Sequence, residues 1–519
     1  MNDEILKTIK EKGLLLEREV FELVNGFQNP LIAKNFLEKL EIFSGRKLIN
    51  KNVIQQNKEY VKTFISEFYQ NDDNSLERIF VKLGLSLEIV SEKNIEKNYF
   101  KKEQDYQIFY ADTGTEKKLD VGDFTGNFRS RYQQLQKILM NRTELNNLVS
   151  INKISNDRQS LGIIGIVSEK RITKNKNLII IFEDLTGSVS ALVKYDKKEI
   201  FEIASELQLD DVVGIKASGN RDLLFIYNIF FPDAFIYEKS KFDEDISIAF
   251  LSDVHAGSDR HLGKSFLKFI EWINSDDINA KRIKYIFFLG DNVDGVGIFP
   301  GQENFLELKS MEEQYHLLAS YLKKIPKNIT MFMCPGQHDA VRVAEPQPII
   351  SRKYANELYE IENLILVTNP TLVKLIEKDK EFKILMYHGA SIHTFINEIK
   401  ELRIIKAHKT PAKAVKHMLK RRHLAPSHSD VVYIPNRNRD PLVIEVVPDV
   451  LCIGEVHRLD IENYNGVLII TGSCWQAQTN FEEKIGNIPD PCKVPVLNLK
   501  TRELKIYDFK VEEEVDRWN

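Results

Sequence analysis

Residues 246–255 read ISIAFLSDVH, an apolar run that ends abruptly in a serine, an aspartate and a histidine. A short run of apolar residues bounded in this way predicts a buried β-strand. Asp253 and His255 have one residue between them at the end of that strand, so both side chains can face the same ion. This stretch therefore predicts a strand that delivers metal ligands where it ends.

Five more apolar runs in the second half of the chain end in residues that bind metal or phosphate. They are residues 285–289 before GDNVDG, 329–333 before PGQHD at 335–339, 382–386 before YHG, 450–453 before GEVH, and 467–470 before TGS. Buried strands that all deliver Asp, His or amide side chains at one end build a single convergent site. A lone Asp-x-His is common by chance, whereas this ordered set indicates metal-dependent phosphoester chemistry.

The composition narrows the class of protein. The length of 519 residues favours about three domains, and 43% hydrophobic residues are enough for large cores. A net charge of −4 excludes a global polycation, so any contact with nucleic acid must come from local basic patches. The four cysteines lie far apart without a CxxC pair, which disfavours a zinc finger or a disulfide framework and favours a reducing compartment. No apolar run reaches the roughly 18 residues of a membrane span, so we expect a cytoplasmic protein without a membrane partner.

Spacing and composition divide the chain into four segments. Residues 1–70 predict a small helical module, whose surface is either a partner-docking site or an ordinary solvated face. Residues 71–120 are polar and lysine-rich and predict a tether. Residues 121–240 combine a helix, expected at 128–148, with a set of strand-like runs, and residues 241–519 hold the six strand-end motifs.

The strand-like runs of the third segment predict a small barrel. They are residues 161–167, 177–182, 189–193, 212–217 and 223–229, with a helical stretch at 198–206 before the fourth run. Five strands with a helix before the fourth indicate an OB-type barrel, a fold that often serves nucleic acid. No convincing row of exposed aromatic residues marks this segment, so a strand-binding barrel and a structural or docking barrel both stay open.

Hydrolysis of a phosphodiester needs a nucleophile at neutral pH, neutralisation of charge on the phosphoryl oxygens, and a proton for the leaving oxygen. Two divalent ions about 3.5–4 Å apart meet the first two needs. Such a pair requires one bridging carboxylate and a few oxygen and nitrogen ligands on each side. Asp291 follows Gly290, which lets the backbone approach closely, and it is the natural bridge.

The motifs together resemble those of the calcineurin-like metallophosphoesterase superfamily, which are Asp-x-His, Gly-Asp-x-x-Asp, Gly-Asn-His-Asp, a lone His after a strand, and Gly-His-x-His. Neighbouring segments narrow the resemblance. The segments SDVHAGS at 252–258, HDAVR-x-AEPQP at 338–348, LKRRHLAP at 419–426 and TGSCWQAQT at 471–479 are similar to the small subunit of archaeal family-D DNA polymerase. The likeness covers roughly residues 120–510 and extends only weakly to the N-terminal module and tether.

This resemblance implies a multidomain α+β protein, in which a four-layer αββα metallophosphoesterase domain follows an OB-type β-barrel and a small N-terminal helical module. It implies a subunit of a replicative polymerase with 3′-to-5′ proofreading exonuclease activity and two divalent metal ions, Mn²⁺ or Mg²⁺. The implied partners are a large catalytic polymerase subunit, DNA with a single-stranded 3′ end, and a sliding clamp reached through the complex.

The resemblance also implies roles for individual residues. Carried over position by position, the first metal would be held by Asp253, His255, Asp291 and His457, and the second by Asp291, Gln337, His388 and Glu455. His338 matches the histidine expected to act as general acid or to stabilise phosphate charge, a role that typically contributes about 10²–10⁴-fold in rate. Asp294 and Asp339 are expected to cap turns or to orient the ligands.

Two departures from the family pattern fall at the second metal. The pattern has Asn where Gln337 stands and His where Glu455 stands. Glutamine moves the amide oxygen outward, and glutamate replaces a neutral ligand by an anion that lowers the Lewis acidity of the ion. We expect weakened or strongly Mn²⁺-dependent activity. The alternatives are a non-catalytic scaffold subunit with a degraded metal site and a free-standing phosphoesterase that acts on small nucleotides.

A basic run from Arg403 to Arg422 contains no acidic residue and lies between two of the ligand strands. It is either a solvated helix face or a track for a DNA backbone. The DNA-binding candidates in this run are Lys420, Arg421 and Arg422. Arg342, four residues after His338, is a candidate phosphate clamp, with a structural ion pair as the alternative.

Overall fold

The computed structural model divides into two compact units, Met1–Glu103 and Gln104–Asn519. It describes residues 9, 10, 12–17, 20, 21, 24, 33, 34, 36, 37, 47–49, 53, 105–114 and 118–512. In the first unit, β1 (Leu15–Leu16) pairs in parallel with β2 (Leu48–Ile49). The predicted helical module thus includes a short strand pair, and most of the predicted tether lies outside the described residues.

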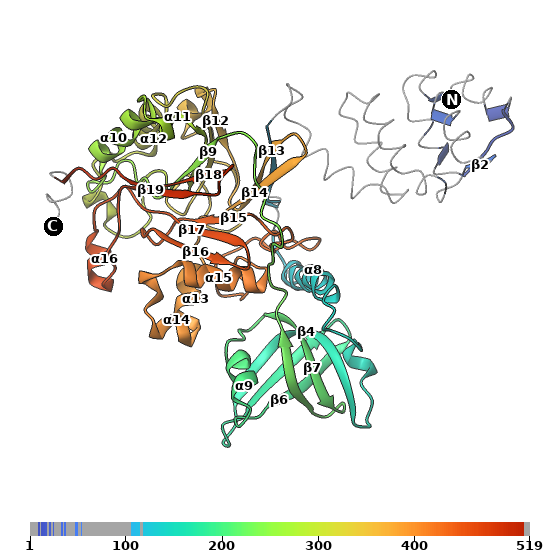
Figure 1. Cartoon of the computed structure of the whole chain (residues 1–519). Helices are drawn as coiled ribbons and strands as arrows, with labels where there is room; N and C mark the ends of the chain where they lie inside the picture. Colours follow the sequence, from blue (N-terminus) through green and yellow to red (C-terminus); the bar gives the residue numbers. More distant parts are fainter. Residues whose placement is uncertain are drawn as a thin grey trace. The chain divides into compact units, whose positions relative to one another are not determined.

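The first sheet of the second unit has the strand order β12-β11-β10-β9-β18-β19 (Figure 1). Its strands are β9 (Ser247–Leu251), β10 (Ile283–Leu289), β11 (Thr330–Cys334), β12 (Leu364–Leu366), β18 (Lys493–Asn498) and β19 (Leu504–Asp508). Strands β9 to β12 pair in parallel, and β18 joins β9 in the antiparallel direction. Because parallel strands end at the same edge of a sheet, the motifs after β9, β10 and β11 lie together.

The second sheet has the order β16-β17-β15-β14-β13-β3. Its strands are β3 (Tyr106–Tyr110), β13 (Thr371–Glu377), β14 (Lys380–Met386), β15 (Val450–Ile453), β16 (Asp460–Tyr464) and β17 (Val467–Thr471). Strands β14, β15 and β17 pair in parallel, so the other three motifs share an edge of this sheet. The tether predicted for residues 71–120 is wrong at its end, because β3 pairs with β13 and turns Tyr106 and Ile108 toward the apolar core.

One apolar core lies between the two sheets. It combines residues of the first sheet, such as Phe250 and Phe287, with residues of the second, such as Ile384 and Cys452. The rings of Phe250 and Phe287 stack with centroids 5.5 Å apart. Strands that are buried on both faces read as continuous apolar runs, which is why these segments were recognisable in the sequence.

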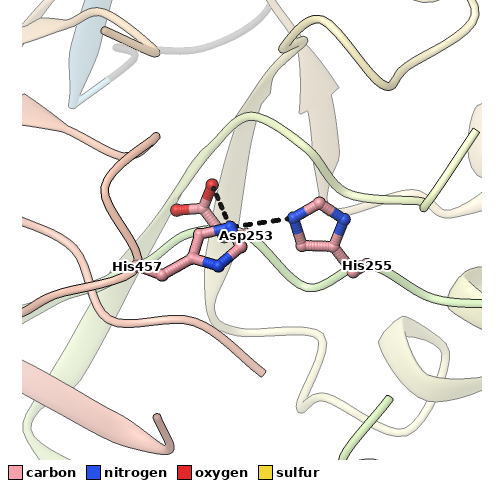
Figure 2. A group of neighbouring side chains, drawn as sticks. All are labelled: Asp253, His255 and His457. Carbon is pink, nitrogen blue, oxygen red and sulfur yellow. Dashed lines mark hydrogen bonds and ion pairs between the residues drawn. The ribbon is translucent and has the colours of Figure 1, made fainter. Parts of the chain in front are cut away.

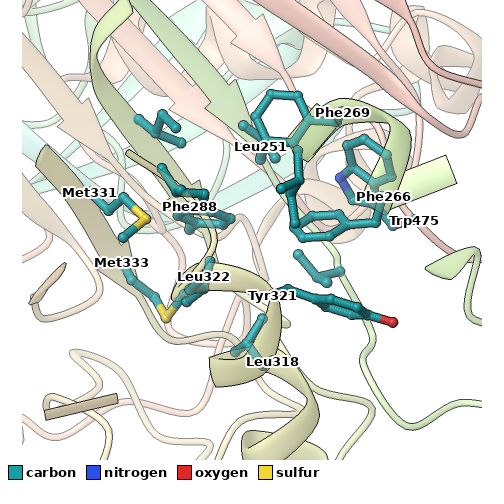
Figure 3. Close-up of a cluster of buried hydrophobic side chains, with 14 of the residues drawn as sticks. Leu251, Phe266, Phe269, Phe288, Leu318, Tyr321, Leu322, Met331, Met333 and Trp475 are labelled. Atoms are coloured by element: carbon teal, nitrogen blue, oxygen red, sulfur yellow. The ribbon is translucent and has the colours of Figure 1, made fainter. Parts of the chain in front are cut away.

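Helices cover the outer face of each sheet. On the first sheet lie α10 (Gly263–Ile273), α11 (Ile278–Lys281) and α12 (Met311–Leu322). Phe266 and Phe269 of α10 and Leu318 of α12 pack with Phe288 and Trp475 (Figure 3). On the second sheet lie α13 (Ile392–Glu398), α14 (Lys400–Ile404) and α15 (Ala412–Arg421), which bury their apolar side chains against β15 and β17.

The five predicted strands of the third segment form a closed barrel of order β4-β5-β6-β8-β7. They are β4 (Gln159–Ile172), β5 (Leu178–Asp184), β6 (Gly187–Val193), β7 (Val212–Gly219) and β8 (Leu224–Phe230), and α9 (Lys198–Ser205) precedes β7. The barrel closes through the pairing of β4 with β7. Its inward side chains, such as Ile163, Phe182 and Ile215, form a separate core.

The helix α8 (Val121–Met140) precedes the barrel and begins and ends earlier than the predicted 128–148. Its start is fixed by Asp120 and Asp123, whose side chains bond each other's backbone N–H groups in a capping box. Among the described residues of the second unit, the other short helices are η1 (Ile151–Lys153), η2 (Gln302–Asn304), η3 (Asn356–Glu360), η4 (Ala407–Lys409) and α16 (Asn480–Ile485). None of the helices in the described part of the chain has the length and apolar character that crossing a bilayer demands.

Candidate metal centre

The strand ends of the two sheets bring the predicted side chains together. In one group, ligand atoms of Asp253, His255 and His457 all lie within 4.8 Å of one another, and in a second group the same holds for Asp253, Asp291 and His388. Asp253 and Asp291 follow strands of the first sheet, whereas His388 and His457 follow strands of the second. A site predicted from separate stretches of sequence is therefore a single cluster built across both sheets.

Asp253, His255 and His457 face one another (Figure 2). The Nε2 atom of His457 lies 3.6 Å from Oδ1 of Asp253 and 3.1 Å from Nε2 of His255. The other nitrogen of each ring is already engaged. Nδ1 of His255 lies 3.0 Å from Oδ1 of Asp294, and Nδ1 of His457 lies 3.1 Å from Oε1 of Glu482.

This arrangement fits a cation. A carboxylate accepts the Nδ1–H of each imidazole, so the Nε2 lone pairs of His255 and His457 are directed at each other. Such a pair is stable only with positive charge between the nitrogens. Burial would lower the pKa of His457, but Glu482 and Asp253 outweigh it and raise that pKa to about 9. A divalent ion supplies the same charge without a proton.

Asp291, His388 and Glu455 form the second half of the cluster. Nε2 of His388 lies 3.2 Å from Oδ2 of Asp291 and 3.2 Å from Oε2 of Glu455. Its Nδ1 donates to the backbone carbonyl of Leu289 over 2.7 Å. That bond fixes the tautomer and turns the Nε2 lone pair toward the two carboxylates. Three electron-rich atoms thus converge where one cation would bind all of them.

Two buried side-chain oxygen atoms of the predicted ligands lack a hydrogen-bond partner among the described residues. They are Oδ2 of Asp253 and Oε1 of Gln337. A buried acceptor without a partner costs about 1–3 kcal/mol. Carboxylate and amide oxygens are ligands that Mn²⁺ and Mg²⁺ accept well, so both atoms have the chemistry of metal ligands.

Neighbouring histidines lower the pKa values of two carboxylates in the second half of the cluster. Burial would raise the pKa of Asp291, but His388 and His338 hold it well below its ordinary value. Burial would also raise the pKa of Glu455, while His388 and His393 hold it low. Burial would lower the pKa of His388, yet Asp291 and Glu455 raise it well above its ordinary value. Asp291 and Glu455 are therefore anions that need positive charge nearby.

His338, the predicted general acid, lies beside this cluster with a side chain 23% exposed. Its Nδ1 lies 2.6 Å from the backbone carbonyl of Asp294, and its backbone N–H donates to Oδ1 of Asp291 over 2.9 Å. Its Nε2 is 4.0 Å from Oδ2 of Asp291. The imidazole is thus held by one nitrogen and presents the other to the site.

Five of the predicted metal ligands have a left-handed backbone conformation. Asp253, His255, Asp291, Glu455 and His457 all have positive φ, between 47° and 72°. Non-glycine residues rarely adopt this conformation, which costs on the order of 1–3 kcal/mol each and clusters at functional sites. This unfavourable conformation in the turns after the strands directs the side chains of these residues toward one another.

Glycines allow the loops to approach the ligands closely. A Cβ atom on Gly336 would lie 2.2 Å from Oδ1 of Asp291, and one on Gly454 would lie 2.7 Å from Oδ2 of Asp253. Neither distance is compatible with a real side chain. These positions accept only glycine if the carboxylates are to keep their places.

The variant Gly336→Ala is therefore expected to displace Asp291 and to weaken Mn²⁺ binding by roughly 10–100-fold, as displaced supporting contacts at metal sites do. Titration calorimetry on the metal-free full chain measures this change. Gly187→Ala is the matched control, because the nearest atom to its new Cβ lies 3.7 Å away. Equal Mn²⁺ affinity in Gly336→Ala and the wild type would contradict the assignment of Asp291.

The sequence does not predict some of the residues that contact the metal ligands. Glu482 orients His457. The pattern Thr479-x-x-Glu482 is typical of a helix start, but it does not predict the contact between Glu482 and His457. His393 lies 3.3 Å from Glu455 through a contact between residues far apart in sequence. Asp294 does orient His255, in agreement with the prediction. Asp339 accepts bonds from Gly336, Asn292 and Tyr315 and supports the loops around the ligands.

The predicted DNA track at Lys420, Arg421 and Arg422 is wrong. Lys420 and Arg421 form ion pairs with Glu206 and Asp211 next to the barrel, and the Arg421–Asp211 pair is almost fully buried. Arg422 is buried and donates to the backbone carbonyls of Ile444 and Glu445. Buried cations must be paired, and the sequence does not reveal the partners because they lie far away along the chain.

Arg342, the predicted phosphate clamp, also has internal partners. Its guanidinium donates to the backbone carbonyls of Ala344 and Pro346 over 3.1 and 2.8 Å and contacts the carbonyl of Thr113. These bonds fix the loop after His338. The side chain therefore has a structural role in this loop.

Comparison with known proteins identifies the family. Residues 248–460 match the family of DNA polymerase alpha/epsilon B subunits. The chain is 35% identical over 437 residues to the DNA polymerase II small subunit of Pyrococcus furiosus, covering 79% of this chain and 70% of that one. It is 36% identical to the Pyrococcus abyssi protein of the same name, covering 76% of this chain and 64% of that one.

A further relative matches nearly end to end. The DNA polymerase II small subunit of Methanothermobacter thermautotrophicus is 32% identical over 507 residues, covering 96% of this chain and 98% of that one. Among solved structures, an archaeal phosphodiesterase covers 50% of this chain at 15% identity, with a TM-score of 0.25 that is too low to support an argument. At these identities and coverages, this chain belongs to the family of archaeal DNA polymerase II small subunits.

Proposed function

We propose that this small subunit hydrolyses DNA phosphodiesters from the 3′ end with two divalent ions, Mn²⁺ or Mg²⁺. The observation that carries the proposal is the convergence of the three imidazoles of His255, His388 and His457. Each has its Nδ1 engaged by a carboxylate or a carbonyl and its Nε2 directed at buried carboxylates or at another Nε2. Side chains that only stabilised the fold would not leave their electron pairs facing one another.

The ligands divide between two ions. The residues that would hold the first are Asp253, His255, Asp291 and His457, and those that would hold the second are Asp291, Gln337, His388 and Glu455. When bound, the two ions would supply an activated water and neutralise charge on the phosphoryl oxygens. Asp291 would be the shared ligand, because its carboxylate lies next to both His388 and Asp253.

His338 would supply the proton for the leaving oxygen. The carbonyl of Asp294 accepts the Nδ1–H of this imidazole, so Nε2 is the atom that faces the substrate side. Burial would lower the pKa of His338, but Asp291 and Asp294 raise it above its ordinary value. A protonated imidazole near neutral pH can give its proton to a departing alkoxide.

The proposed function implies two domains in the second unit. We assign residues 121–240 to a helix plus OB-type barrel and residues 241–519 to a four-layer αββα metallophosphoesterase domain. The barrel order β4-β5-β6-β8-β7 and the separate helix-covered outer faces of the two sheets support these assignments. The partners in this proposal are the large catalytic polymerase subunit, a single-stranded 3′ end of DNA, and a clamp reached through the complex.

A non-catalytic scaffold is the second candidate, and Gln337 and Glu455 favour it. Both stand where the resemblance to calcineurin-like metallophosphoesterases leads us to expect other residues, and Glu455 would add an anion at the second ion. The number of bound ions separates the two candidates. A catalytic subunit should hold two Mn²⁺ per chain, whereas a scaffold should hold fewer.

The direct test is an assay on single-stranded DNA labelled at the 3′ end. With Mn²⁺ the full chain should release labelled nucleotides, with Mg²⁺ it should do so more slowly, and a chelator should stop release. A strand labelled at the 5′ end should shorten in single-nucleotide steps. The absence of any release, both alone and with the large subunit, would contradict the nuclease, and fewer than two bound Mn²⁺ per chain in the same protein would establish the scaffold instead.

A further inference from the structure

We infer that His393, supported by His408, is a positioning residue that makes Glu455 a one-oxygen ligand of the second ion. The inference rests on the proposed function, because it concerns the geometry of that metal site. It assigns a role to two histidines that no motif marks. It also accounts for Glu455 at a position where the resemblance to calcineurin-like metallophosphoesterases leads us to expect a histidine.

The two oxygens of Glu455 have different partners. Oε1 lies 3.3 Å from Nε2 of His393, at the start of α13. Oε2 lies 3.2 Å from Nε2 of His388, which in turn lies 3.2 Å from Asp291. The backbone N–H of Glu455 also donates to Oδ1 of Asp253 over 3.2 Å. The carboxylate is therefore fixed at both ends, and only Oε2 faces the second ion's ligands.

His408 fixes the orientation of His393. Its Nε2 lies 3.4 Å from Nδ1 of His393, and the two rings stack at 28° with centroids 5.5 Å apart. With both imidazoles neutral, His408 donates Nε2–H to Nδ1 of His393, and His393 donates Nε2–H to Oε1 of Glu455. These two successive hydrogen bonds, from His408 to His393 and from His393 to Glu455, form without a charge on either imidazole. They determine which nitrogen of His393 faces the carboxylate.

A free carboxylate can bind an ion through one oxygen or both, whereas an imidazole binds through a single nitrogen. With Oε1 held by His393, Glu455 offers one donor atom, as a histidine would. The anion is then also a hydrogen-bond acceptor, which draws part of its charge away from the ion. His393 thus reduces both differences between a glutamate and a histidine as a ligand at this position.

The test is Mn²⁺ binding to the metal-free full chain, measured by titration calorimetry and by metal content after gel filtration. In His393→Ala, we expect the affinity for the second Mn²⁺ to fall by roughly 10–100-fold, because removal of a residue that orients a metal ligand typically has an effect of this size. The affinity for the first Mn²⁺ should stay unchanged. His393→Gln should recover most of that loss, because its amide N–H can donate to Oε1 of Glu455.

Two controls separate positioning from a structural role. His316→Ala removes a surface histidine that also pairs with a glutamate, since Nδ1 of His316 lies 2.5 Å from Oε1 of Glu357, and it should leave Mn²⁺ binding unchanged. In a Glu455→Ala background, His393→Ala should cause no further loss. The inference is overturned if His393→Ala binds the second Mn²⁺ as tightly as the wild type does. It is also overturned if His393→Ala lowers Mn²⁺ affinity equally in the Glu455→Ala background, or if the wild type binds only one Mn²⁺. Two tightly bound Mn²⁺ that depend on His393, without hydrolysis, would instead reject only the proposed function.

Discussion

Replacing Asp291 with alanine is expected to lower the rate of hydrolysis at the DNA 3′ end by at least about 10²–10³-fold, the loss that removal of one electrostatic stabiliser causes. The reason is that Asp291 is the only described carboxylate in contact with both His388 and His338. Without it the two ions would lose their shared ligand. Release of a 3′ label from single-stranded DNA in Mn²⁺ measures the rate, with the wild type assayed in parallel.

The protein itself should remain folded in Asp291→Ala. The change removes one buried anion from a cluster in which Asp253 already opposes it. Asp276→Ala is the matched control, because Asp276 is fully exposed and pairs only with Lys281 on the surface. Equal traces of label released by Asp291→Ala and the wild type would refute the nuclease, since the activity would then come from a contaminant.

The second large effect concerns stability at the junction between α8 and the loop after α15. Asp440→Ala is expected to destabilise the protein by about 3–5 kcal/mol, because it leaves a buried cation without its partner. Nε of Arg131 lies 2.7 Å from Oδ2 of Asp440, and both side chains are 2% exposed. Asn127 and His423 bond the same oxygen over 3.1 Å each. Chemical denaturation followed by circular dichroism measures the loss.

The pH of that measurement matters. Burial would raise the pKa of Asp440, but Arg131 and His423 hold it below its ordinary value of 3.8. A carboxylate with a lowered pKa stabilises the folded state above its ordinary pKa, and that contribution is lost as the pH falls. The full cost of Asp440→Ala should therefore appear at pH 7 and shrink in acid below about pH 4.

Arg439→Ala is the control for this junction. Arg439 pairs with Glu445 on the surface, with side chains 65% and 37% exposed, and such pairs are worth about 0–1 kcal/mol. A loss in Asp440→Ala no larger than that in Arg439→Ala would show that the buried network contributes little to the fold.

The local chemistry of this protein was readable from its sequence. Each predicted strand in the second unit forms within a few residues of its expected position, because apolar runs bounded by Gly, Pro and polar residues have few alternatives to a buried strand. Asp253, Asp291, His388 and His457 were identified for the same reason, since each stands within four residues of the end of such a run. Positive φ angles at Asp253, Asp291 and His457 then direct these side chains into the site.

The sequence by itself thus determined which residues stand at the ends of strands and which barrel strands exist. Only the tertiary structure decided which residues meet across the two sheets, and this set the partners of Glu455 and His457. It also decided that Arg421 and Arg422 are buried and not on a DNA-facing surface. The physical reason is that periodicity records the burial of one element, whereas a contact between residues far apart in sequence depends on how whole elements pack.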